Sequence, residues 1–260
     1  MDQTPSRRHF ITSSLLGLGA LGSLGKVSAA SSPKPGFLTE AERDIPLTSD
    51  CDVIVCGAGP AGVTAAISAA RAGAKVRLFE SHGSLGGVWT SSLLGYLLDF
   101  DKPGFNQELV RRLRERDAIA GDGVNGVTYH PEEMKLILEE LCVAAGVKVQ
   151  LHTRIVAAQR NGRQLTAIVT ESKSGRQAWA APVFIDTTGD GDLGARAGCE
   201  FEIGREQSCP CQPMTLYALV TVNDAKALAD QLHPVGGNGR HVGPDKFKAA
   251  LAAAGVTPSY

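Results

Sequence analysis

A glycine-rich turn at residues 57–62, with the sequence Gly-Ala-Gly-Pro-Ala-Gly, constrains the fold of this chain more than any other feature. The preceding run, Asp52–Cys56, is apolar and rich in β-branched residues, as in a strand buried on both faces. A helical pattern follows from Val63 to Ala72 and ends at Gly73, and Lys75–Phe79 then predicts a second strand. The segment therefore predicts a β-α-β unit.

The spacing of the glycines fits the G-x-G-x-x-G pattern of dinucleotide-binding sites. Gly57 permits the tight turn, Gly59 lets the backbone approach a pyrophosphate, and Gly62 lets the helix pack closely on the sheet. Glu80 ends the second strand, close to the spacing of a ribose-binding acid, and its charge argues against a 2′-phosphate. Val63 stands where a P-loop would need lysine, which excludes that motif. The unit predicts dinucleotide binding and leaves NAD and FAD open.

The first thirty residues have the pattern of an export signal. Arg7 and Arg8 precede Phe10 and a weakly apolar, glycine-rich stretch that ends in small residues before position 31. Paired arginines in this context are typical of the twin-arginine signal, which is a receptor-read address. We expect residues 1–30 to engage the twin-arginine export machinery, giving a periplasmic or exported protein, and residues 31–50 to form a linker. A basic N-terminus without this role, or a membrane anchor if cleavage fails, remains the alternative.

Charge and composition exclude several classes of protein. The formal net charge is -1, from 26 basic and 27 acidic residues, which gives no electrostatic footprint for nucleic acid. No apolar run approaches the roughly 20 residues of a membrane span, so none is expected after cleavage of the signal. Six cysteines are too few for a disulfide scaffold in a chain of 260 residues.

The sequence after Glu80 does not continue with the regular βα units of an NAD dehydrogenase. Its patterns predict a helix near 106–116, a second helix from His130-Pro131 to Ala145, and a strand at 147–151. Three short β runs follow at 154–159, 164–171 and 177–181, separated by Asn-Gly and Ser-Gly turns. A last strand, 183–185, leads into the sequence Asp-Thr-Thr-Gly-Asp-Gly-Asp at 186–192.

This order of motifs resembles the FAD-dependent oxidoreductases of the glutathione-reductase-like flavoprotein superfamily. Within that superfamily, residues 86–90 (Gly-Gly-Val-Trp-Thr), 93–95 and 101–104 resemble a bacterial, often exported branch. The resemblance covers about residues 50–200 and implies an α/β fold, with a Rossmann-like FAD-binding domain that combines a parallel sheet and a β-meander. It also implies that the 57–62 and 186–192 turns close around the same FAD.

The resemblance assigns the cofactor contacts residue by residue. The first turn would line the FAD diphosphate, Glu80 and Ser81 would lie at the adenosine ribose, and Thr90 would reach toward the flavin. The backbone of Ile155 would meet adenine, and Asp190 would approach the ribityl and diphosphate region. The implied cofactor-binding residues are Gly57, Gly59, Pro60, Ala61, Gly62, Glu80, Ser81, Gly86, Gly87, Thr90, Ile155, Gly189 and Asp190.

No metal site is expected. Asp186, Asp190 and Asp192 could begin a calcium loop, but Ala197 stands at position 12, where glutamate is required. Cys209-Pro210-Cys211 lacks the C-x-x-C spacing of redox and metal motifs, so a structural loop is the favoured interpretation over redox or metal use.

Other reactive residue types have structural interpretations. Cys56 and Cys142 fall in a predicted buried strand and helix, as small core residues do. His130 is interpreted as the start of a helix rather than a catalytic base. Trp89 either covers the flavin or fills a gap in the core.

The domain prediction follows from these patterns. Residues 51–199 form the FAD-binding domain, and residues 200–260, with a strand at 215–222, begin a substrate domain that we expect to be truncated. The predicted function is hydride or electron transfer between a small organic substrate and an acceptor, neither identified, with no catalytic residue assigned. The alternatives are a non-catalytic FAD-binding chain that needs a partner chain, and an NAD-dependent dehydrogenase.

Overall fold

The computed structural model describes residues 35–38, 40, 42–98, 101–122 and 126–204, and the single residues 211, 224, 249, 252, 253 and 255. The chain divides into two units, one ending at Asp44 and one beginning at Ile45. Every element discussed below belongs to the second unit. The predicted signal at 1–30, Cys209, the predicted strand at 215–222 and most of the predicted substrate domain lie outside the described residues.

A four-stranded parallel sheet forms the centre of the second unit. Its order is β11 (Val183–Asp186), β2 (Val53–Cys56), β3 (Val76–Phe79) and β7 (Lys148–Gln150). Helix α1 (Pro60–Arg71) connects β2 to β3, and helix α3 (Pro131–Ala145) leads into β7. Each of these elements was predicted, with shifts of one to three residues at its ends. The predicted α/β fold with a parallel sheet and Rossmann-like domain is confirmed.

A second sheet carries the predicted β-meander. Strands β8 (Arg154–Asn161), β9 (Gln164–Ser172) and β10 (Gly175–Ala180) pair antiparallel in chain order. The sheet also contains β1 (Leu47–Thr48), which runs parallel to β10. Residues 47 and 48 fall in the predicted linker, and the structure differs because their partner strand, β10, lies more than a hundred positions later in the chain.

A third, antiparallel sheet was not predicted. It has the order β4 (Tyr96–Leu98), β6 (Gly126–Tyr129) and β5 (Ile119–Asp122). Helix α2 (Phe105–Glu115) lies between β4 and β5 in the chain and packs on α3. The remaining elements are a short 3₁₀ helix, η2 (Gly87–Trp89), and helix α4 (Asp192–Arg196).

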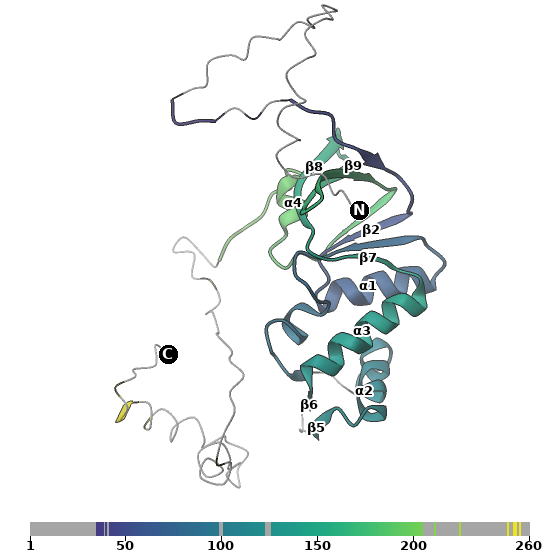
Figure 1. Cartoon of the computed structure of the whole chain (residues 1–260), viewed down its shortest axis with the longest axis vertical. Coiled ribbons are helices and arrows are strands. Elements are labelled where there is room, and N and C mark those ends of the chain that lie inside the picture. The colour runs from purple at the N-terminus through teal and green to yellow at the C-terminus, as the bar shows by residue number, and fades with distance from the viewer. Residues whose placement is uncertain are drawn as a thin grey trace, which may run out of the picture. The chain divides into compact units, whose positions relative to one another are not determined.

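Figure 1 shows the parallel sheet between two layers, with β8 and β9 on one side and helices α1 and α3 on the other. Alternate residues of β2 point to the two layers. Val53 and Val55 join the core against the helices, whereas Ile54 and Cys56 join the core against the meander. This two-sided burial explains why β2 is an unbroken apolar run.

Local sequence signals set the ends of the helices. Helix α1 begins at Pro60, three residues before the apolar pattern, because proline is tolerated at the first helical position. His130 is the N-cap residue of α3, and Gly146 ends that helix with a φ of 76°. The interpretation of His130 as a helix start is consistent with this geometry.

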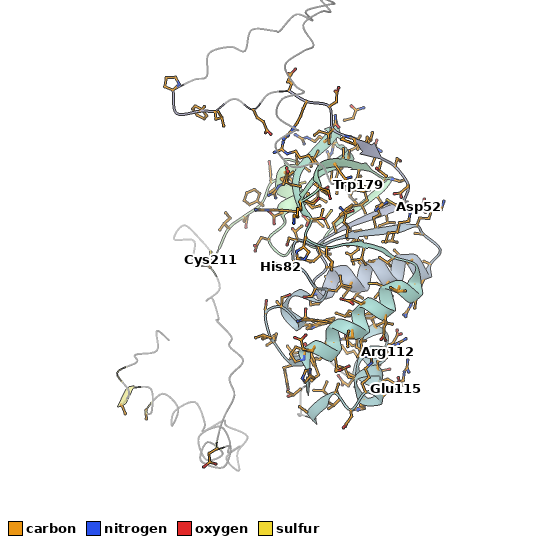
Figure 2. All side chains as sticks on the ribbon, viewed as in Figure 1. Asp52, His82, Arg112, Glu115, Trp179 and Cys211 are labelled. Carbon is orange, nitrogen blue, oxygen red and sulfur yellow. The ribbon has the colours of Figure 1, made fainter. Side chains whose placement is uncertain are left out.

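An ionic and aromatic cluster joins the parallel sheet to the meander. The guanidinium of Arg77 donates to Asp50 at 2.6 and 2.7 Å and lies 4.4 Å from the ring centroid of Trp179. The Trp179 ring packs 5.1 Å from that of Phe79, and its Nε1 donates to Thr170 at 2.9 Å. Figure 2 labels Trp179 in the meander layer. Because hydrogen bonds from Arg77 stabilise the carboxylate, the pKa of Asp50 is lowered well below its ordinary value.

The two cysteines assigned to the core are buried there. Burial raises the pKa of both Cys56 and Cys142 to about 12, which keeps the thiols protonated. Among the described residues, no helix is long and apolar enough to cross a membrane.

Candidate cofactor site

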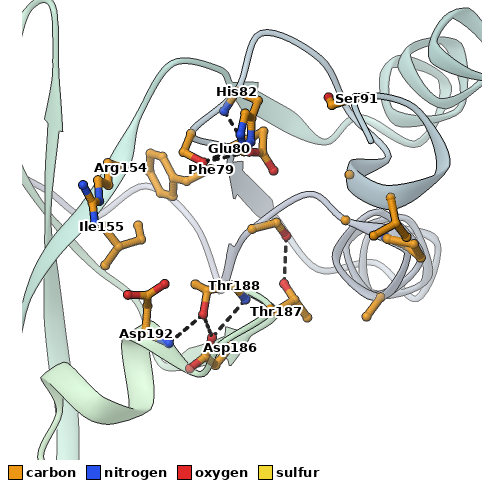
Figure 3. Close-up of a pocket in the computed structure, with 18 of the residues that line it drawn as sticks. Phe79, Glu80, His82, Ser91, Arg154, Ile155, Asp186, Thr187, Thr188 and Asp192 are labelled. Carbon is orange, nitrogen blue, oxygen red and sulfur yellow. Dashed lines mark hydrogen bonds and ion pairs between the residues drawn. The ribbon is translucent and has the colours of Figure 1, made fainter. Parts of the chain in front are cut away.

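The carboxyl ends of three parallel strands meet at one pocket. Strand β2 lies between β3 and β11, so the chain leaves β2 toward one neighbour and returns much later on its other side. Ligands of open α/β sheets bind at such a reversal of strand order. The pocket has a volume of about 1060 Å³, at the upper end of the roughly 300–1,000 Å³ of small-molecule sites. Figure 3 shows its lining residues.

Gly57 and Gly62 allow three backbone segments to meet beneath the pocket. A Cβ on Gly57, where φ is 98°, would lie 2.3 Å from the carbonyl oxygen of Thr187. A Cβ on Gly62 would lie 1.8 Å from the carbonyl oxygen of Gly57. Glycine at these positions is therefore required by close packing, as the motif predicts.

Gly59 has a different environment from the other two glycines of the motif. It is the N-cap residue of α1, its φ is -66°, and a Cβ there would meet nothing within 4 Å. None of the described side chains caps the helix, so the first-turn N–H groups are available to an anion, and the helix dipole favours one. Gly59, Pro60 and Ala61 all line the pocket.

Glu80 directly follows β3, and its buried carboxylate accepts hydrogen bonds from neighbouring residues of the chain. Its Oε1 accepts the His82 N–H at 2.8 Å and the Ser81 hydroxyl at 3.1 Å, with His82 Nδ1 at 3.0 Å. Its Oε2 accepts the Ala58 N–H at 2.7 Å, which ties β3 to the glycine turn. Burial raises the pKa of this carboxyl, but the hydrogen bonds from His82 and Ala58 outweigh burial, and the pKa is lowered.

The turn after β11 is organised by Asp186 and joined to the glycine turn by Thr187. Asp186 accepts the Thr188 hydroxyl at 2.7 Å and the Gly194 N–H at 2.8 Å. The Thr187 hydroxyl lies 2.8 Å from the carbonyl oxygen of Gly57 and 2.9 Å from that of Cys56. The expectation that the 57–62 and 186–192 turns lie together is therefore met by the structure.

A second glycine pair lies beside the first turn. Gly86 donates its N–H to the Ala58 carbonyl at 2.7 Å, and a Cβ on Gly87 would come within 3.0 Å of the Gly59 Cα. Thr90, expected to reach toward the flavin, is instead fully buried, and its hydroxyl donates to the Leu85 carbonyl.

Trp89 packs against the hydrophobic core between the sheet and the helices, and it is not among the described lining residues of the pocket. Its carbonyl accepts the hydroxyl of Tyr129 at 2.8 Å. Of the two alternatives for Trp89, the structure favours the core.

Nine of the thirteen residues implied as cofactor contacts line the pocket: Gly57, Gly59, Pro60, Ala61, Glu80, Ser81, Gly87, Ile155 and Gly189. The other four lie outside the lining. Gly62 and Gly86 are packed against neighbouring backbone or side chains, Thr90 is buried, and Asp190 is exposed to solvent.

Several residues that line the pocket are not predicted by the sequence motifs. They are Phe79, His82, Val88, Ser91, Ser92, Thr153, Arg154, Asp186, Thr187, Thr188, Gly191 and Asp192. Many of them directly follow or end a parallel strand, and the rule that ligands bind at the carboxyl ends of strands could have indicated them. Asp186 also bonds the N–H two residues on, a local turn that its Asp-x-Thr sequence favours.

A sequence model of the family described as FAD dependent oxidoreductase matches residues 52–253, most of the chain. The chain belongs to this FAD-dependent oxidoreductase family. The predicted cofactor, FAD, is confirmed, and the alternative of an NAD-dependent dehydrogenase is not retained.

Sequence relatives of the chain include thiamine thiazole synthases. That of Pyrobaculum aerophilum is 36% identical over 122 residues, covering 46% of this chain and 44% of the synthase. That of Saccharolobus islandicus strain L.S.2.15 is 33% identical over 101 residues, covering 38% of this chain and 36% of the synthase. The matched part spans less than half the length of these relatives.

Solved structures that are similar to part of the chain include a THI4 protein and a flavin-dependent brominase. THI4 from Thermovibrio ammonificans has a TM-score of 0.43 at 19% identity, over 56% of this chain and 60% of its own. The flavin-dependent brominase Bmp2 has a TM-score of 0.48 at 14% identity, over 58% of this chain and 41% of its own.

The residues present fit FAD. A large pocket lies at the N-terminus of α1, where none of the described side chains caps the helix. Because Gly59 has no side chain, the space in front of its Cα is open to a ligand. Within the described part of the chain, the Oε2 atom of Glu80 accepts one hydrogen bond, which leaves a lone pair for a ribose hydroxyl.

Proposed function

We propose that this chain transfers a hydride or electrons between a small organic substrate and an acceptor, using FAD held in the pocket described above. The observation that carries the proposal is the contact between Gly57 and the Thr187 turn at the carboxyl ends of neighbouring strands. Two loops that are 130 residues apart in the chain thereby touch each other and line one pocket. The three-layer order supports a fold of the glutathione-reductase-like type.

Each part of the pocket would take a different part of the cofactor. The N-terminus of α1 and the backbone of Gly59 would hold the diphosphate, because the helix dipole and free N–H groups favour an anion. Glu80 would accept a hydroxyl of the adenosine ribose through Oε2, with Ser81 beside it. The Thr188–Gly189 turn would face the ribityl chain.

When bound, FAD supplies an isoalloxazine ring that accepts a hydride or single electrons. The side chains of this chain bind and orient the cofactor. Glu80 and Asp186 remain ionised at neutral pH, since hydrogen bonds from His82, Ala58 and Gly194 hold their pKa values low. We therefore assign both carboxylates to binding and turn structure and neither to proton transfer.

The experiment is to purify the full chain and record its absorption spectrum, then add candidate substrates under anaerobic conditions. Bound FAD whose absorption bleaches with a substrate supports the proposal. Bound FAD that no substrate reduces would instead favour the non-catalytic, partner-dependent alternative. A protein that folds but binds no flavin would overturn the assignment of the pocket.

We also propose that residues 1–30 direct the chain through the twin-arginine pathway, on the basis of Arg7, Arg8 and Phe10. This route carries folded proteins and suits a protein that acquires its cofactor before export. A reporter fused after residue 30 should reach the periplasm, and replacing both arginines with lysine should retain it in the cytoplasm. Export of the double variant at the original level would contradict the proposal.

A further inference from the structure

The pocket has a conspicuous imbalance of charge. Among the described residues that line it, Arg154 is the only arginine or lysine, whereas Glu80, Asp186 and Asp192 are acidic. The acids are engaged: Glu80 and Asp186 accept backbone N–H groups, and Asp192 pairs with Arg196 at 2.5 Å. The role of Arg154 is therefore not explained by an acidic neighbour in the pocket.

The strand pairing explains why Arg154 has no ion pair in the described part of the chain. Arg154 starts β8 and lies opposite Glu171 of β9, which in turn lies opposite Arg176 of β10. Glu171 accepts a hydrogen bond from Arg176 Nε at 2.6 Å. The carboxylate closest in register to Arg154 is thus already paired, and the exposed Arg154 side chain stays at the rim of the pocket.

Backbone contacts place Arg154 at the Glu80 end of the pocket. The N–H of Thr153 donates to the carbonyl oxygen of Glu80 at 2.8 Å, which holds the start of β8 against the end of β3. Ile155, the next residue, is buried and lines the pocket with Phe79. Figure 3 shows Arg154 on the same side of the pocket as Ile155 and Phe79.

We propose that Arg154 is a specificity-determining residue of this site, and that its planar guanidinium stacks on the adenine ring of the dinucleotide. The inference rests on the proposed function, in which Glu80 binds the adenosine ribose. A base attached to that ribose lies next to Arg154 and the apolar surface of Ile155 and Phe79. Guanidinium groups stack on aromatic faces, and exposed ones lose little hydration in doing so.

Pairing with the diphosphate is the competing role for this cation. The diphosphate already has the N-terminus of α1 as its positive partner, and Gly59 gives it room there. Arg154 lies beyond Glu80, on the meander side. Stacking depends on the planar group, whereas ion pairing depends on charge alone, so lysine separates the two roles.

The experiment measures dissociation constants of FAD, ADP and FMN for the apo form of the full chain, at low and high salt. The variants are Arg154→Ala and Arg154→Lys, with Arg163→Ala as the matched control, an exposed arginine at the β8–β9 turn outside the lining. Both Arg154 variants should bind FAD and ADP about tenfold more weakly. FMN, which lacks adenosine, should bind equally to all four proteins, and Arg163→Ala should match the parent chain.

Three results would overturn the inference. Unchanged FAD affinity in Arg154→Ala would show that the side chain makes no contact. Parent-like affinity in Arg154→Lys, with the loss in alanine abolished by salt, would assign Arg154 to a phosphate instead. In both cases FAD still binds and the proposed function stands, whereas a parent chain that binds neither FAD nor ADP removes both proposals.

Discussion

Two glycines of one short motif perform opposite tasks at the scale of single residues. Gly62 has no room for a side chain, because a Cβ there would overlap the Gly57 carbonyl. Gly59 has an ordinary φ and open space in front of it, in a pocket where a ligand's anion would lie. Gly62 therefore serves the fold, and we propose that Gly59 serves binding.

Gly62→Ala and Gly59→Ala should therefore fail in different ways. Gly62→Ala should destabilise the protein by about 3 kcal/mol, because the helix must move away from the turn. In the apo form, Gly59→Ala should keep the parent melting temperature, but it should bind FAD about tenfold or more weakly, since the methyl group fills space needed by the diphosphate. Thermal melts and FAD titrations of both variants measure this; equal melting temperatures would contradict it.

Glu80 gives the stability of the protein a pH dependence that can be isolated. Its folded pKa lies below its ordinary value of 4.5, so the carboxylate stabilises the fold above that pH and loses this effect as the pH falls. Glu80→Gln should be less stable than the parent by about 1–3 kcal/mol at pH 7, because an amide N–H would face the donors of Ala58 or His82. Urea unfolding at pH 7 and pH 4 should show this difference shrink on acidification. If the difference in stability between the parent and Glu80→Gln is the same at both pH values, it arises from the shape of the side chain and not from its charge.

At the scale of elements, strong local patterns were sufficient to predict helices and strands from the sequence. The pairing of short strands that are far apart in the chain was not predictable. The β2–α1–β3 unit, α3, the meander and β11 follow from apolar periodicity, helix caps and turn residues. The third sheet was missed because β4, β5 and β6 are three or four residues long and lack a clear alternation. Strand β1 has two residues, and only its pairing with β10 makes it a strand.

The candidate site shows the same division. Residues within the glycine motif and Glu80 were identified from spacing, whereas Phe79, Arg154 and Thr187 required knowledge of which strand ends lie side by side. Thr90 belongs to a matching motif, yet its neighbours bury it. Motif spacing specifies the backbone of such a loop better than the direction of its side chains.

Thr187→Val tests the link between the two turns. Valine preserves the volume but removes the hydroxyl that bonds the Gly57 and Cys56 carbonyls, which should cost about 1 kcal/mol and weaken FAD binding. Thr166→Val is the matched control, because its hydroxyl bonds the Gln159 carbonyl at 3.0 Å outside the pocket lining. The control should leave the FAD dissociation constant unchanged. If both variants bind FAD as the parent does, the link has no role in binding.

At the scale of the whole molecule, cofactor binding and folding are coupled. Ligand that binds only the folded chain stabilises it, by about 2.7 kcal/mol at one hundred times its dissociation constant. Because the pocket is built from β2, β3, β8 and β11, it exists only in the folded state. FAD added to the apo protein should raise its melting temperature in proportion to the logarithm of the FAD concentration. FMN should raise it less, and no rise with FAD would contradict the assignment.

The pairing of β2 with β11 also sets the earliest moment in synthesis at which a cofactor can be captured. The glycine turn leaves the ribosome 130 residues before Thr187, a delay of roughly 7–26 s at 5–20 residues per second. Until then the part of the pocket formed by the 186–192 turn does not exist, and the edge of β2 that pairs with β11 is unpaired. Nascent chains of this protein therefore pass through an aggregation-prone interval that ends only when β11 arrives.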